Sequence, residues 1–106
     1  MADTHPELQR FRASIDSIDR ALLELLAARF EVTQEVGEYK RDNDLPAVDP
    51  AREAAQFEQI ERRATELGVN PDLARSVFRV IINEVVRNHQ ALRGIPEPRA
   101  PWAPPA

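Results

Sequence analysis

The chain has 106 residues, 42% of them apolar and 30% charged, which is typical of a single soluble globular domain. The net charge is −4 and the pI about 5.2, without a run of Lys or Arg, so we expect it to bind neither nucleic acid nor an anionic membrane. There is no cysteine, and neither His5 nor His89 has a neighbour at ligand spacing, so we expect no disulfide and no metal site. Apolar stretches are too short to span a membrane, and the first residues lack the features of a secretory signal, which favours a cytoplasmic protein.

The first predicted helix covers residues 7–41, which contain no proline and one glycine. Apolar residues recur there every three or four positions, the spacing of one helix face. A helix of this length extends roughly 50 Å, whereas a compact fold of ~100 residues has a radius of gyration near 13 Å. One chain cannot cover such a helix, so we expect an intertwined homodimer. The apolar positions are Leu8, Phe11, Ile15, Ile18, Leu22, Leu25, Val32, Val36 and Tyr39.

Two further helices each begin with a capping residue followed by proline. Asp49 and Pro50 open a helix of about 50–67, and Asn70 opens another of about 71–92. The last residues hold five of the nine prolines and should be extended or disordered. The predicted fold is all-α, with three helices and no strand. Its parts are an N-terminal arm (1–6), a helical domain (7–93) and a Pro-rich tail (94–106).

Arg29 and Lys40 lie eleven residues apart on the first helix, a separation of about 20° around the axis and roughly 16 Å along it. They therefore share a face, and Arg29 interrupts its apolar stripe. A buried cation needs an anionic partner. The pair indicates either a site for a small anion or a buried ion pair of Arg29 with Glu24, Glu31 or an acid of the second helix. Lys40, near a helix end, is equally consistent with a solvated charge that interacts with the helix dipole.

Other charged residues could contribute to such a site only in particular arrangements. Arg12 precedes Arg29 by about 25 Å along the same helix, so a small ligand reaches both only if Arg12 comes from an antiparallel partner chain. Arg52 and Glu53 lie in the first turn of the second helix, and His89 lies near the end of the third. Arg52 and Glu53 could also be ordinary surface charges, and His89 could be a half-buried structural side chain.

Taken in order, these residues resemble the all-helical chorismate mutases. The likeness covers about residues 7–93, without insertion or deletion, and looks most like the actinobacterial branch. Two stretches, VTQEVG (32–37) and RNHQ (87–90), look most like the actinobacterial branch. The stretches that match the family are LQRFR (8–12), IDSID (15–19), LLELLAAR (22–29), VGEYK (36–40), PAVDPARE (46–53) and FRVII (78–82).

The resemblance implies rearrangement of chorismate to prephenate, on the route to phenylalanine and tyrosine, without a cofactor. The enzyme selects the reactive conformer and stabilises charge that develops on the ether oxygen. By resemblance, Arg29 binds one carboxylate and Arg12 of the partner subunit helps with the second. Lys40 donates to the ether oxygen, and Glu53 accepts from the ring hydroxyl.

The remaining site positions include two departures from the family pattern. Asp49 would hold the loop and cap, and Arg52 would reinforce the carboxylate contacts. His89 stands where many relatives have a glutamine donor; a neutral imidazole donates one N–H and a protonated one carries a charge. Val85 stands where a small hydroxyl residue is frequent. Both departures predict modest intrinsic activity.

Some actinobacterial relatives reach full rate only when docked on DAHP synthase, so the resemblance also implies that enzyme as a possible partner. Two alternatives remain open at this stage. One is a related enzyme, an isochorismate-pyruvate lyase or an aminodeoxychorismate mutase, although the segment 49–53 favours the chorismate enzyme. The other is a non-catalytic helical dimer that docks through its Pro-rich tail and Trp102.

Overall fold

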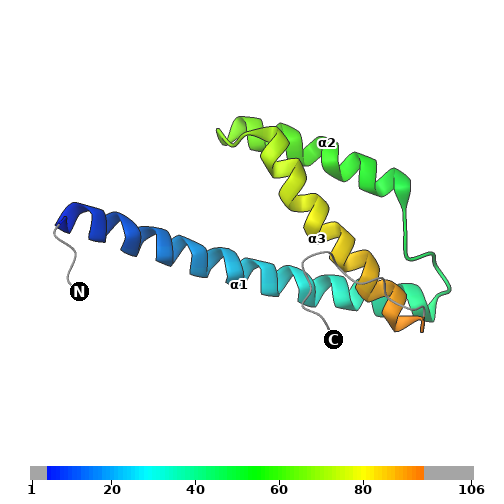
Figure 1. Ribbon diagram of the computed structural model, residues 1–106. Coiled ribbons are helices and arrows are strands. Elements are labelled where there is room, and N and C mark those ends of the chain that lie inside the picture. Colours follow the sequence, from blue (N-terminus) through cyan, green and yellow to red (C-terminus); the bar gives the residue numbers. More distant parts are fainter. Residues whose placement is uncertain (1–4, 95–106) are drawn as a thin grey trace, which may run out of the picture. The chain divides into compact units, whose positions relative to one another are not determined.

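The computed structural model describes residues 5–94, which form three α-helices and no strand (Figure 1). Helix α1 spans Pro6–Asp42, α2 spans Pro50–Glu66 and α3 spans Pro71–Leu92. Each boundary lies within one residue of the range expected from the sequence. The all-α prediction is confirmed. None of these helices is long and apolar enough to cross a membrane.

The capping signals at the start of α2 and α3 are confirmed. A carboxylate oxygen of Asp49 accepts a hydrogen bond from the backbone N–H of Arg52 at 3.1 Å. The side-chain oxygen of Asn70 accepts from the backbone N–H of Asp72 at 2.9 Å. Each bond satisfies a backbone donor that has no partner within its own helix, and the proline that follows the cap needs none.

Glycines follow the C-terminal ends of the same helices. Gly68 has φ 77° and Gly94 has φ 76°, in the left-handed region where a side chain is strained. Residue 94 therefore belongs to the end of α3, whereas the rest of the predicted tail, residues 95–106, lies outside the described residues. Residues 1–4 of the predicted arm also lie outside them, and Pro6 already belongs to α1.

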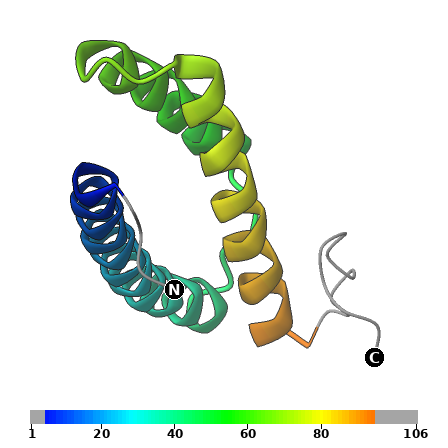
Figure 2. The same ribbon diagram turned by 60° about the vertical axis from the view of Figure 1, so that its left-hand side comes forward.

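Helices α2 and α3 pack against each other after a short turn (Figure 2). The most buried apolar side chains of the described residues are Phe57 and Ala64 on α2 and Ile82 on α3, at 3%, 6% and 7% exposure. The last turns of α1 contact the end of α3, where the side chains of His89 and Leu92 lie beside Gly37. This packing brings residues from all three helices together.

The chain divides into two compact units, Met1–Val32 and Thr33–Ala106, so that the division falls within α1. In the first unit the apolar residues of α1 are largely exposed, including Phe11 at 53%, Ile18 at 65% and Leu25 at 68%. An exposed row of apolar side chains on a helix indicates a surface that binds another element. The predicted homodimer stays a prediction.

Candidate active site

Glu53 lies in the first turn of α2, one turn beyond the Asp49 cap, where the helix dipole favours negative charge. Its Oε1 accepts a hydrogen bond from Nη1 of Arg79 on α3, so that the two groups form an ion pair between the helices. The Glu53 side chain keeps 25% of its surface exposed. The carboxylate is therefore fixed by α3 and still open to a ligand.

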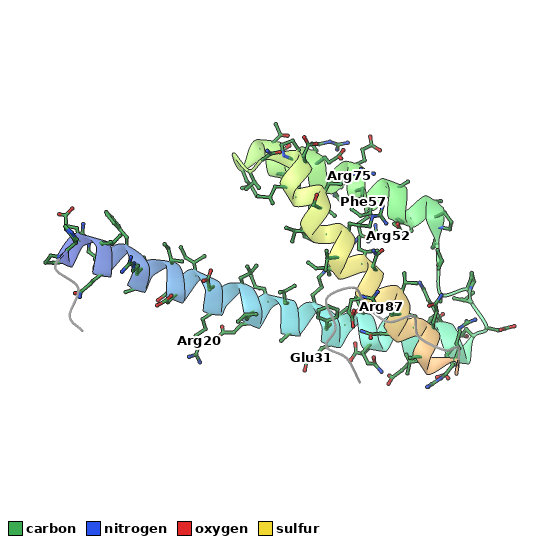
Figure 3. The ribbon with its side chains drawn as sticks, viewed as in Figure 1. Arg20, Glu31, Arg52, Phe57, Arg75 and Arg87 are labelled. Atoms are coloured by element: carbon green, nitrogen blue, oxygen red, sulfur yellow. The ribbon has the colours of Figure 1, made fainter. Side chains whose placement is uncertain are left out.

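Two arginines of α3, Arg79 and Arg75, lie over the ring of Phe57. Phe57 and Arg75 are labelled in Figure 3. The guanidinium carbon of Arg79 is 4.2 Å from the ring centroid and that of Arg75 is 5.0 Å from it. Arg75 also donates to Oε1 of Glu61 at 2.9 Å. A cavity of about 420 Å³ opens here, lined by Val48, Pro50, Glu53, Ala54, Phe57, Glu58, Glu61, Arg75 and Arg79.

Neither arginine was singled out from the sequence. The sequence does contain a pattern that could have identified them. Glu53, Phe57 and Glu61 are spaced by four residues on α2, and Arg75 and Arg79 are spaced by four residues on α3. Residues four apart share a helix face. The pairing of the two faces, however, depends on how the helices pack, which this pattern does not specify.

His89 is buried, with 3% of its surface exposed, and its Nε2 lies 2.8 Å from the carbonyl oxygen of Thr33. A carbonyl oxygen only accepts, so Nε2 carries the hydrogen and donates. In the neutral ring Nδ1 then holds a lone pair, and it has no hydrogen-bond partner among residues 5–94. The single N–H of a neutral His89 is therefore bound to Thr33, and a role of His89 toward a ligand stays a prediction.

Lys40 lies in the last turn of α1 and is half-buried. Its backbone carbonyl accepts from Leu45 N–H at 2.8 Å and from Nη2 of Arg93 at 3.0 Å, which joins this turn to the following loop and to the end of α3. Within the described part of the chain, its ammonium group has no ion pair or hydrogen bond. Its charge is therefore left for a ligand or for solvent.

The other predicted binding residues of this unit are Val85, Arg52 and Asp49. Val85 is half-buried on α3, one turn before His89. Arg52 is exposed, and in residues 5–94 its guanidinium makes no ion pair. Asp49 uses its carboxylate as the α2 cap. The unit thus contains Lys40, Glu53, Val85 and His89 together with the cap.

Arg12 and Arg29 belong to the first unit. Arg12 is exposed and Arg29 is half-buried. Of the acids considered as partners for Arg29, Glu24 forms an exposed ion pair with Arg20 at 3.0 Å. Carboxylate binding by Arg29, and by Arg12 of the partner subunit, stays a prediction. No group of three or more potential metal-ligating side chains occurs among the described residues.

The profile of the family chorismate mutase type II matches residues 11–90, about three quarters of the chain. The chain belongs to this family of isomerases. Among its relatives, the T-protein of Enterobacter agglomerans is 46% identical over 78 residues, which are 74% of this chain and 21% of that protein. The chain thus spans about a fifth of that relative's length.

Two shorter relatives match over most of their own length. The 4-amino-4-deoxychorismate mutase of Streptomyces pristinaespiralis is 35% identical over 86 residues, which are 81% of this chain and 66% of that protein. The chorismate mutase of Methanocaldococcus jannaschii is 30% identical over 76 residues, 72% of this chain and 77% of that protein. These relatives come from several lineages, so membership of the actinobacterial branch is not confirmed.

Proposed function

We propose that this chorismate mutase family member catalyses the rearrangement of chorismate to prephenate. The observation that carries the proposal is Lys40, a half-buried cation whose ammonium has no partner among residues 5–94. A cation removed from water is costly unless a ligand supplies negative charge. In the rearrangement, negative charge develops on the ether oxygen as its bond to the ring lengthens. Lys40 would stabilise that charge.

The other residues of the site would select the reactive conformer. Glu53 would accept a hydrogen bond from the ring hydroxyl, and Arg29 would bind one carboxylate of the substrate. The ether C–O bond breaks and a C–C bond forms within the substrate itself, so no protein nucleophile and no proton transfer are needed. The protein would then act by positioning the substrate and by stabilising the charge that develops in the transition state.

We also propose that the protein functions as a homodimer. The exposed apolar side chains of α1 include Ile15 at 53% and Leu22 at 56%, and a second copy of α1 would bury them. An antiparallel copy would bring Arg12 of the partner subunit toward Arg29. Sedimentation equilibrium gives the mass directly, and Leu22→Glu should yield a less active monomer. A fully active monomer would contradict the dimer.

The test of the function is the loss of chorismate and the appearance of prephenate with the purified protein. We further propose DAHP synthase as an activating partner, because the only N–H of a neutral His89 is bound to Thr33 and a rearrangement of this region would release it. The assay is therefore run alone and with DAHP synthase from the same source. Slow turnover that rises with DAHP synthase supports activation; fast turnover alone contradicts the need for it.

A second candidate substrate is 4-amino-4-deoxychorismate, because a relative of 35% identity is named for it. The two substrates differ at the ring substituent that Glu53 would face. A hydroxyl donates one hydrogen bond to a carboxylate, whereas an ammonium group adds a positive charge. The same assay with both substrates decides between them, and a higher kcat/KM for the amino compound would replace the proposed reaction.

A further inference from the structure

We propose that Arg79 is a positioning residue that holds the Glu53 carboxylate in the orientation needed to accept the substrate's ring hydroxyl. This inference rests on the proposed function. Arg79 lies 26 residues from Glu53, on a different helix, and its Nη1 donates to Oε1 of Glu53. The inferred role is to act through Glu53 rather than to touch the substrate.

The arrangement follows from helical spacing on two antiparallel helices. Glu53, Phe57 and Glu61 succeed one another by one turn on α2, and Arg79 and Arg75 do so in the reverse direction on α3. Two ion pairs result, Arg79 with Glu53 and Arg75 with Glu61, and the ring of Phe57 lies between them.

Arg79 is itself held in place by the ring. Its guanidinium carbon lies 4.2 Å from the centroid of Phe57, which is 3% exposed and therefore fixed by the α2–α3 packing. A planar guanidinium stacks well on an aromatic face and still has donors at its edge. Phe57 thus orients Arg79, and Arg79 orients Glu53.

The ion pair leaves Glu53 able to bind a ligand. An ionised carboxylate has two oxygens and about four acceptor positions, and the hydrogen bond from Arg79 uses one of the two oxygens. The Glu53 side chain keeps 25% of its surface exposed and that of Arg79 keeps 42%. A restrained carboxylate also loses less rotamer freedom when the substrate binds.

Arg75 is a matched control in the same chain. It covers the same ring at 5.0 Å and forms an equivalent ion pair with Glu61 at 2.9 Å. Glu61 lies eight residues, or about 12 Å, beyond Glu53 on α2. Arg75→Gln therefore removes a similar amount of structure without affecting the Glu53 carboxylate.

The experiment measures kcat/KM for chorismate and the thermal midpoint of Arg79→Gln, Arg75→Gln, Glu53→Gln and the double variant Glu53→Gln/Arg79→Gln. We expect Arg79→Gln to lower kcat/KM at least tenfold and Arg75→Gln to change it less than twofold, at similar thermal midpoints. In the Glu53→Gln background, Arg79→Gln should have less than a twofold effect, because the group it positions has lost its charge. Arg79→Lys should recover part of the activity.

The other outcomes overturn the inference in distinguishable ways. A wild-type protein without mutase activity refutes the proposed function, and the positioning role with it. An active wild type with equal losses in Arg79→Gln and Arg75→Gln refutes the positioning role alone. The same holds if Arg79→Gln has its full effect in the Glu53→Gln background. If Arg79→Gln does not fold, Arg79→Lys and Arg75→Lys provide the comparison under the same criteria.

Discussion

The imidazole of His89 occupies the space that a Cβ atom on residue 37 would need. A Cβ at Gly37 would lie 2.5 Å from Cδ2 and 2.9 Å from Nε2 of His89. The same Nε2 reaches the carbonyl of Thr33, one turn earlier on α1. Because glycine has no side chain, residue 37 leaves room for the buried ring of His89 to bind the backbone of α1.

We expect Gly37→Ala to destabilise the protein by about 1–3 kcal/mol, because the new methyl group displaces His89 and Leu92. In a helix interior without such contacts, the same change would stabilise by roughly 0.5–1 kcal/mol. Urea unfolding at fixed protein concentration measures the difference. In a His89→Ala background the destabilisation should shrink markedly; an undiminished effect there would contradict the steric explanation.

Much of the fold could be predicted from local sequence signals. The caps at Asp49 and Asn70 and the apolar spacing of three and four give the helix boundaries to within one residue. These features depend on residues that are close in sequence. They therefore do not require knowledge of how the helices pack.

The contacts between helices could not be predicted in this way. His89 contacts Thr33 across 56 residues, and Arg79 pairs with Glu53 across 26. The sequence identified His89 and Glu53 as candidates but not what they contact, because that depends on helix packing. The role of Gly37 is likewise defined only by the ring that lies against it.

The Asp49 cap gives a prediction that separates stability from binding. Asp49→Ala removes the acceptor for the Arg52 N–H and should cost about 1 kcal/mol of stability. Asp49→Asn keeps an oxygen acceptor and should be close to wild type in urea unfolding. If the carboxylate serves only as a cap, Asp49→Asn also keeps wild-type kcat/KM. A selective loss of activity in that variant would instead give the charge a role in the site.

Arg29 is predicted to contribute to transition-state binding. Arg29→Ala should lower kcat/KM about a hundredfold, or roughly 2.7 kcal/mol, with the helical circular dichroism signal retained. Arg20→Ala is the control, because Arg20 lies on the same helix and forms only an exposed pair with Glu24, with 84% and 67% of the two side chains exposed. Similar activity in the two variants would remove Arg29 from the site.

The hydrogen bond of His89 to Thr33 predicts the effect of His89→Gln. The buried ring binds the carbonyl of α1 through Nε2 and lies against Gly37. A glutamine carries an N–H donor but no ring, so it can keep the hydrogen bond and loses the packing. If His89 acts only through this packing, His89→Gln lowers the free energy of unfolding, measured by urea unfolding, and keeps a kcat/KM close to wild type. A selective loss of kcat/KM at unchanged stability would instead give the imidazole a role in the site.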